Sequence, residues 1–219
     1  MKTDMKLKTD IEEELRWDPK VNEAQIGVSV DKGAVSLNGA VDTYAEKWAA
    51  EDAVKRVAGV RTIAMDLGVK LSSAHTRTDS DIAAALQSAM KWNVFIPTTV
   101  TATVVKGVVT LSGQVHWNFE RDAAYHAARN LKGVINVYNS ISLRPENPSV
   151  EKVNEKVGAA LQRQATADAK SIHVETAGGK VTLSGHASSW QSIKDASWAA
   201  WAAPGVTEVV DKISVWTAG

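Results

Sequence analysis

Apolar residues along this 219-residue chain alternate between a helical and a strand-like spacing, and the whole pattern occurs three times. Near the N-terminus, Leu7, Ile11 and Leu15 are four residues apart, which places them on one face of a helix. A spacing of three or four residues returns twice, at Ile82, Leu86 and Met90 and again at Val150, Val153, Val157 and Leu161. Each stripe lies among polar residues and predicts an amphipathic helix.

Two short strands are predicted after each helix. In the first, apolar residues occupy alternate positions, namely Ile26, Val28 and Val30, then Val100, Ala102 and Val104, then Ile172 and Val174. The second strand carries the motif G-x-V-[ST]-L-x-G, found at 33–39, 107–113 and 179–185. The short connection before its opening glycine predicts a β-hairpin turn with positive φ. The closing glycine predicts a bulge or a close backbone approach. The glycines expected to have structural roles are Gly33, Gly39, Gly59, Gly107, Gly113, Gly133, Gly179, Gly185 and Gly205.

A second helix and a third strand complete each copy. The helix has a stripe of mostly alanine in every copy, so it is expected to lie close on its sheet. It ends at a glycine that follows the closing glycine of the motif by twenty residues: Gly59, Gly133 and Gly205. The third strand contains, in turn, Ile63, Leu67 and Val69; Val137, Ile141 and Leu143; and Val209, Ile213 and Val215.

These elements predict an α+β protein of three tandem αββαβ modules. Each module is a small three-stranded sheet with two helices on one face, because a β-α-β connection is a right-handed crossover. Module 1 is predicted at residues 1–71, module 2 at 79–144 and module 3 at 149–219, with linkers at 72–78 and 145–148. Modules of this size bury little surface, so packing between copies is expected.

Composition excludes several classes of function. The chain has no cysteine, which rules out disulfides and thiolate metal sites. Its 25 basic and 25 acidic residues balance, and nucleic-acid binding is not expected without a basic excess. The αββαβ order resembles part of the KH arrangement, but no G-x-x-G loop joins two helices. No apolar run is long enough for a transmembrane segment. No secretory signal follows Met1, so a cytoplasmic location is expected, or a periplasmic one if the chain is a processed form.

Nothing in the sequence predicts catalysis. The five histidines occupy different positions in the three copies and form no metal-ligand pair; they are His75, His116, His126, His173 and His186. Neither a G-x-S-x-G motif nor a phosphate-binding glycine loop occurs. We therefore expect a protein that is not an enzyme and that needs neither metal nor cofactor.

Three tryptophans on the second helices point to an interface. Relative to the alanine stripe, Trp48 of module 1 and Trp198 and Trp201 of module 3 are expected to point away from the sheet. Such large apolar side chains favour contact over exposure to water. The contact would be with a neighbouring module, with a second copy of the chain in a homo-oligomer, or with a membrane or ligand.

A second group of residues is our candidate for lipid contact. Lys91, Trp92, Phe95 and Ile96 follow one another at the end of the first helix of module 2. An aromatic side chain with a neighbouring lysine and two apolar residues is typical of an interfacial anchor. Module 2 also has a small basic excess, seven basic against five acidic side chains between 72 and 147. Trp92 could instead cover the end of the core.

The three G-x-V-[ST]-L-x-G motifs, in register with the later Gly-Val pairs, resemble those of the BON family (bacterial OsmY and nodulation domains). The segments 115–124 and 133–141 are also similar to that family. The resemblance covers nearly the whole chain and implies an αββαβ, OsmY-like, non-enzymatic module. It further implies binding to phospholipid or membrane surfaces and a role in envelope integrity under stress.

Two hypotheses about function follow. In the first, the chain is a bacterial stress or envelope protein that binds anionic phospholipid, or a protein of the envelope, as a peripheral membrane protein through module 2. In the second, it is a protein-interaction scaffold or homo-oligomer that assembles through the tryptophan face of module 3.

Overall fold

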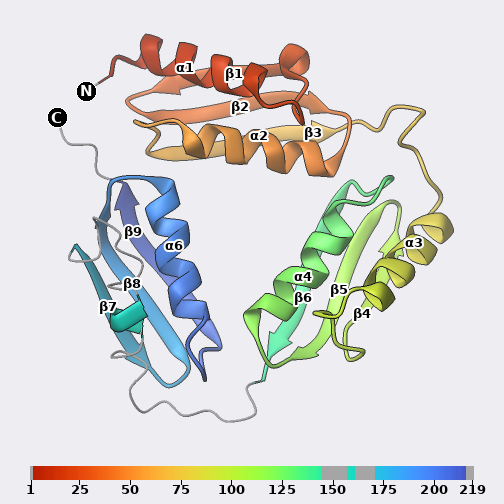
Figure 1. The fold of residues 1–219 in the computed structure, drawn as a ribbon. Helices are drawn as coiled ribbons and strands as arrows, with labels where there is room; N and C mark the ends of the chain where they lie inside the picture. Colours follow the sequence, from red (N-terminus) through yellow and green to blue (C-terminus); the bar gives the residue numbers. More distant parts are fainter. Residues whose placement is uncertain (1, 145–156, 161–170, 216–219) are drawn as a thin grey trace. The chain divides into compact units, whose positions relative to one another are not determined.

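The computed structural model describes residues 2–144, 157–160 and 171–215, which form three α+β modules (Figure 1). The chain divides into two compact units. One contains residues 2–115 and 119–142, and thus most of modules 1 and 2. The other contains 116–118 and the described residues from 143 onward, and thus module 3. The predicted linker 145–148 and the helix positions Val150, Val153 and Leu161 lie outside the described residues.

Module 1 shows the predicted order of elements. Its elements are α1 (Asp4–Trp17), a 3-10 turn η1 (Glu23–Gln25), β1 (Ile26–Asp31), β2 (Ala34–Val41), α2 (Tyr44–Arg56) and β3 (Thr62–Val69). The central strand is β2, which carries the glycine motif. It pairs antiparallel with β1, where Val28 is opposite Leu37, and parallel with β3, where Leu37 is opposite Met65. The parallel pair is joined through α2, as the predicted crossover requires.

Modules 2 and 3 repeat this arrangement. Module 2 contains α3 (Asp79–Trp92), β4 (Thr101–Val105), β5 (Val108–Val115), α4 (Asn118–Arg129) and β6 (Asn136–Leu143), with sheet order β4-β5-β6. Module 3 contains β7 (Ile172–Ala177), β8 (Lys180–Ala187), α6 (Trp190–Trp201) and β9 (Glu208–Val215), with order β7-β8-β9. Of its first helix, residues 157–160 are described and are helical. The predicted α+β class with three tandem modules is confirmed.

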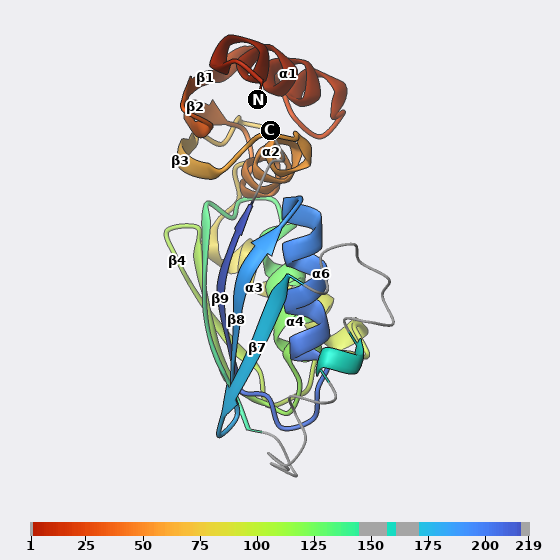
Figure 2. The same cartoon turned by 90° about the vertical axis from the view of Figure 1, so that its left-hand side faces the viewer.

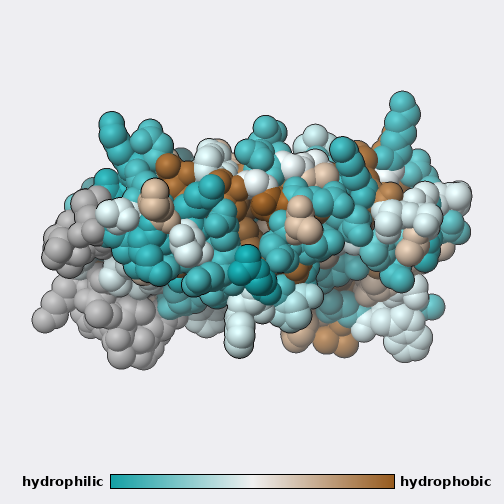
Figure 3. Space-filling view, turned by 90° about the horizontal axis from the view of Figure 1, so that it is seen from above, coloured by the Kyte–Doolittle hydropathy of each residue, from teal (hydrophilic) through white to brown (hydrophobic). Residues whose placement is uncertain are grey.

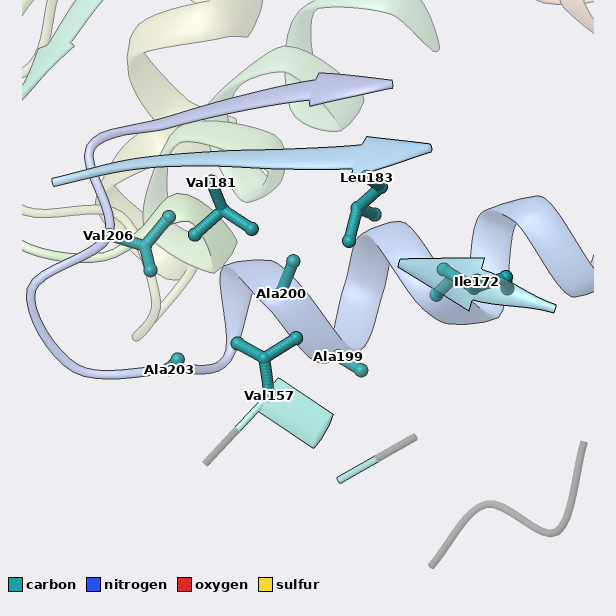
Figure 4. Packing of buried hydrophobic residues seen from close by; sticks show 9 residues of the cluster. Val157, Ile172, Val181, Leu183, Ala199, Ala200, Ala203 and Val206 are labelled. Carbon is teal, nitrogen blue, oxygen red and sulfur yellow. The ribbon is translucent and has the colours of Figure 1, made fainter. Parts of the chain in front are cut away.

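The helices cover one face of each sheet because their apolar stripes are buried there. In module 1 the stripe Leu7, Ile11 and Leu15 is almost completely buried. Module 3 shows the same packing in Figure 4, where Val181 and Leu183 of β8 point toward α6 and Val157 closes the core from the first helix. Figure 2 shows α6 lying along one face of the sheet β7-β8-β9. The small alanines of α6 allow this close approach.

The hairpin turns use left-handed backbone conformations. Lys32 and Gly33 both have positive φ, at 48° and 81°, which is the pattern of a type I′ turn. The carboxylate of Asp4, the first residue of α1, accepts hydrogen bonds from both of their amides at 2.8 and 3.1 Å. Module 2 repeats the arrangement with Asp79 and the amides of residues 106 and 107. The first helix of each of these modules therefore holds the turn of its own sheet.

The turn of module 3 differs from those of modules 1 and 2. There the residue with left-handed φ is Gly178, at 62°, whereas Gly179 is not left-handed. A Cβ on Gly179 would lie 2.8 Å from the carbonyl oxygen of Gly205. The turn thus has the predicted positive φ, at Gly178, and the opening glycine Gly179 is required by a close backbone approach instead.

Candidate functional site

Four large apolar side chains are exposed together in module 2. Trp92 ends α3, Val94 and Phe95 follow it, and Phe119 lies in the first turn of α4. Between 52% and 90% of each residue is exposed to solvent. The rings of Phe95 and Phe119 meet edge to face, with centroids 5.9 Å apart and an interplanar angle of 90°. We call these four residues the apolar patch; clustered exposure of this kind marks interaction sites on soluble proteins.

The patch is built by the way α3 ends. Asn93 is its C-cap, and the side-chain Oδ1 of Asn93 accepts a hydrogen bond from the amide of Phe95 at 3.0 Å. The amide of Ile96 donates to the carbonyl of Asn93 at 3.1 Å. This tight turn directs Val94 and Phe95 outward and Ile96 inward, where only 8% of it is exposed. Ile96 therefore belongs to the core, and the predicted lipid-contact group loses this member.

An exposed lysine lies next to the α3 end of the patch. Lys91 is exposed in the last turn of α3. Asp79 and Asp81 lie in the first turn of the same helix, about 15–18 Å away at 1.5 Å per residue. Their carboxylates are engaged in backbone hydrogen bonds of the turn and of the Thr78 capping box, and the Thr78 hydrogen bonds keep the pKa of Asp81 below its ordinary value. Glu120, half-buried beside Phe119 in α4, is the acidic residue nearest to the patch in sequence.

Module 1 has a tryptophan at the matching position but not a matching patch. Trp17 also ends the first helix of its module and is 84% exposed. The next residue is Asp18, whose carboxylate accepts from the guanidinium of Arg56 at 2.9 Å, and Val21 beyond it is buried. Trp17 is therefore a single exposed ring beside an ion pair, and it provides a matched control for Trp92.

Trp48 contacts module 2 within the unit of residues 2–115 and 119–142. Its ring lies edge to face with Tyr125 of α4, with centroids 5.8 Å apart, and the guanidinium of Arg129 lies 5.3 Å from its centroid. The hydroxyls of Tyr44 and Tyr125 are 3.1 Å apart. Burial and this hydrogen bond raise the pKa of Tyr125, so it remains neutral at physiological pH. Burial and the charge of Arg129 lower the pKa of His126, against the opposite effect of Asp122 and Asp52.

The two tryptophans of α6 differ from one another. Trp198 is 67% exposed, as the helical pattern predicts. Trp201 is half-buried and packs against the core of its own module, so the expectation that it points away from the sheet does not hold. Because Trp201 lies at the last residue of α6, its side chain can fold over the end of the core.

The described residues show neither a metal-ligand group nor a helix that could cross a membrane. Within residues 2–144, 157–160 and 171–215, no group of three or more histidine, aspartate or glutamate side chains could hold a metal ion. Among the helices of this described part, none combines the length and the apolar character that a membrane span needs. Binding through a surface is the chemistry that the patch can support.

Comparison with known families decides the class of the protein. The family model for the BON domain matches three times in tandem, at residues 3–70, 78–145 and 149–216. The chain belongs to the BON domain family. The predicted resemblance, with three copies, is thereby confirmed. BON domains are non-catalytic binding domains, which fits a surface rather than a reaction centre.

Other comparisons add little. Among curated proteins, none matches this BON protein. Two solved structures are similar over most of their length, both of CdsD, described as a structural protein of the type III secretion system of Chlamydia trachomatis. Both are 14% identical to this chain. The first alignment covers 97% of this chain and 93% of the other, with a TM-score of 0.28. The second structure is described as the C-terminal domain, and its alignment covers 100% of both chains with a TM-score of 0.27. At such TM-scores the similarity supports no conclusion about function.

Proposed function

We propose that this BON protein is a non-enzymatic peripheral membrane protein that binds anionic phospholipid through the apolar patch and Lys91. The observation that carries the proposal is the exposure of Trp92, Val94 and Phe95 at the end of α3, together with Phe119 of α4, beside an exposed lysine. An aromatic ring with a cation next to it suits the boundary between headgroups and acyl chains. The resemblance to envelope proteins of the stress response supports the same assignment.

The size of the patch supports weak, reversible binding. Aromatic side chains bury about 150–250 Å² each, and we take about 300 Å² as the area that Trp92, Val94 and Phe95 place in the interface. At about 25 cal/mol per Å² this contributes about 7 kcal/mol. Lys91 adds about 1 kcal/mol next to anionic lipid, and lost freedom of motion costs at least about 4 kcal/mol. The remaining 4 kcal/mol or so corresponds to a Kd of about 1 mM in accessible lipid.

Vesicle flotation tests this proposal. The full chain is mixed with vesicles of phosphatidylcholine alone or with 30% phosphatidylglycerol, at low and at physiological salt. We expect flotation with the anionic vesicles, decreasing as salt screens Lys91. Trp92→Ala combined with Phe95→Ala should reduce the bound fraction at least tenfold, and Lys91→Glu combined with Trp92→Ala should abolish binding. Trp17→Ala removes an equally exposed tryptophan and should leave flotation unchanged.

Three results would contradict the proposal. They are failure of the wild-type chain to float with anionic vesicles, unchanged flotation of the Trp92 variants, and an equal loss in Trp17→Ala. Circular dichroism of each variant establishes that the fold is retained, which is expected because all the substituted side chains are exposed.

A second candidate function has one observation in its favour. Trp198 exposes 67% of its surface in the last turn of α6, and an exposed tryptophan is typical of a protein interface. On this alternative, the chain acts as a scaffold or homo-oligomer through Trp198. Light scattering of the full chain should then show a mass above that of one chain, and Trp198→Ser should return it to 23.5 kDa. A wild-type chain that is monomeric at all concentrations would contradict the homo-oligomer.

A further inference from the structure

An apolar groove lies in module 2 between α3 and β4, the edge strand of its sheet. Its volume is about 510 Å³, within the range of about 300–1,000 Å³ typical of small-ligand pockets. No charged residue lines it; the lining consists of Ala83, Ala84, Leu86, Gln87, Met90, Val100, Thr101, Ala102 and Val104. The two polar members are Gln87 and Thr101, and the hydroxyl of Thr101 already donates to the carbonyl of Ser112.

The corresponding surface of module 1 carries charged side chains and bulkier ones. The modules align through their sheets, because Val28 is opposite Leu37 and Ala102 is opposite Leu111, and through the buried stripes of α1 and α3. In module 1, Lys8 and Glu12 stand where module 2 has Ala83 and Gln87. The Lys8 ammonium lies 3.7 Å from the Glu12 carboxylate.

Two other differences lie along the groove, of which the change from valine to alanine removes side-chain volume. The buried Val28 stands where module 2 has Ala102, and the buried Leu15 corresponds to Met90, which is only half-buried. At the positions that line the groove, module 2 thus has no ion pair and has smaller side chains than module 1.

One end of the groove adjoins the apolar patch. The chain passes from α3 through the turn at 93–99 into β4, so Met90 and Val100 lie at the end of the groove where this turn is. The turn carries Val94 and Phe95, two of the four residues of the patch. At the opposite end lie Ala83 and Val104. One end of the groove is therefore bounded by residues that flank the turn carrying part of the patch.

We propose that this groove receives one acyl chain of a phospholipid whose headgroup lies beside Lys91. The inference rests on the proposed membrane binding and extends it from contact with a surface to capture of a single chain. The uncharged lining fits a methylene chain, which has no polar groups to satisfy, better than a peptide, whose backbone amides and carbonyls need partners. The position of Met90 and Val100, on either side of the turn that carries Val94 and Phe95, favours a bilayer phospholipid as the source.

The test introduces the Lys8–Glu12 ion pair of module 1 at the corresponding positions of module 2. Ala83→Lys with Gln87→Glu places opposite charges in the groove without changing net charge, and the same pair is tolerated on α1. Full-length protein with ¹³C-labelled alanine methyls is titrated with dihexanoyl phosphatidylglycerol below its micelle concentration. We expect saturable shifts of the Ala84 and Ala102 methyls in the wild type, and at least tenfold weaker binding in the double variant. Lys8→Ala with Glu12→Gln in module 1 is the matched control and should not alter the titration.

Several results would overturn the proposal. Shifts caused equally by glycerophosphoglycerol, which has no acyl chains, would assign the effect to the headgroup. Shifts caused by hexanoate but not by the phospholipid would assign it to a free fatty acid. Shifts that depend on protein concentration without lipid would show that a second copy occupies the groove. If the wild type floats with vesicles but no alanine methyl signal shifts, the acyl-chain proposal is wrong and the proposed membrane binding is retained. If the wild type does not float and no signal shifts, both proposals are wrong.

Discussion

Replacing Gly113 by alanine is expected to unfold module 2. Gly113 has φ +129°, a conformation that is essentially restricted to glycine. A Cβ built at this position overlaps the carbonyl oxygen of Thr99, just before β4. Neither atom belongs to a flexible side chain, so the strands β4 and β5 must separate locally. We expect a loss of about 3–5 kcal/mol or more, from strain of about 1–3 kcal/mol and the disrupted strand packing.

Urea unfolding followed by far-ultraviolet circular dichroism measures this loss. A module of this size has a stability of only about 5 kcal/mol, so the variant should show module 2 unfolded or nearly so in water. Gly158→Ala is the control, because Gly158 is helical and a Cβ there meets nothing within 4 Å. That variant should be neutral or more stable by up to about 1 kcal/mol. A Gly113→Ala chain as stable as the wild type would contradict the role of the close approach.

The second large effect is expected from Trp48→Ala. The half-buried indole of Trp48 contacts Tyr125 edge to face and lies under the guanidinium of Arg129. The aromatic pair contributes about 0.5–1.5 kcal/mol beyond buried area, and the cation–π contact contributes a similar amount. Together with the lost apolar surface, we expect a destabilisation of about 2 kcal/mol and a loss of coupling between the unfolding of modules 1 and 2.

A double-mutant cycle separates this contact from a general loss of stability. The free energies of unfolding of Trp48→Ala, Tyr125→Ala and the double variant should show a coupling of about 1 kcal/mol. Trp17→Ala serves as the control, since Trp17 is 84% exposed, and its effect should stay within about 0.5 kcal/mol. A coupling energy of zero would mean that the two rings do not stabilise one another.

Much of the fold was predictable because local rules specify it. The apolar spacing places Leu7, Ile11 and Leu15 on one helix face in any context. The left-handed turn at Gly33 and the close approach at Gly39 can be met only by glycine without strain. Three repetitions of the same constraints at nearly equal intervals therefore predicted three modules, the order of their helices and strands along the chain, and their buried faces.

The candidate site was predictable only in part. Lys91, Trp92 and Phe95 are neighbours along the chain, and their exposure follows from the end of one helix. Phe119 belongs to the patch but comes from α4, and the spacing of residues in the sequence does not predict that it contacts Phe95. Ile96 was assigned to the surface by its position, whereas the hydrogen bonds around Asn93 turn it into the core.

The sequence by itself determined the helices, the strands, the three-fold repeat and the lack of thiol chemistry, because these depend on residue type and on spacing within one segment. Tertiary structure alone decided which apolar residues remain exposed. Trp198 and Trp201 lie three residues apart on one helix, and only the packing of the helix end separates an exposed ring from a half-buried one. The same holds for the groove of module 2, which exists because Ala83 and Ala102 come from two elements that the fold brings together.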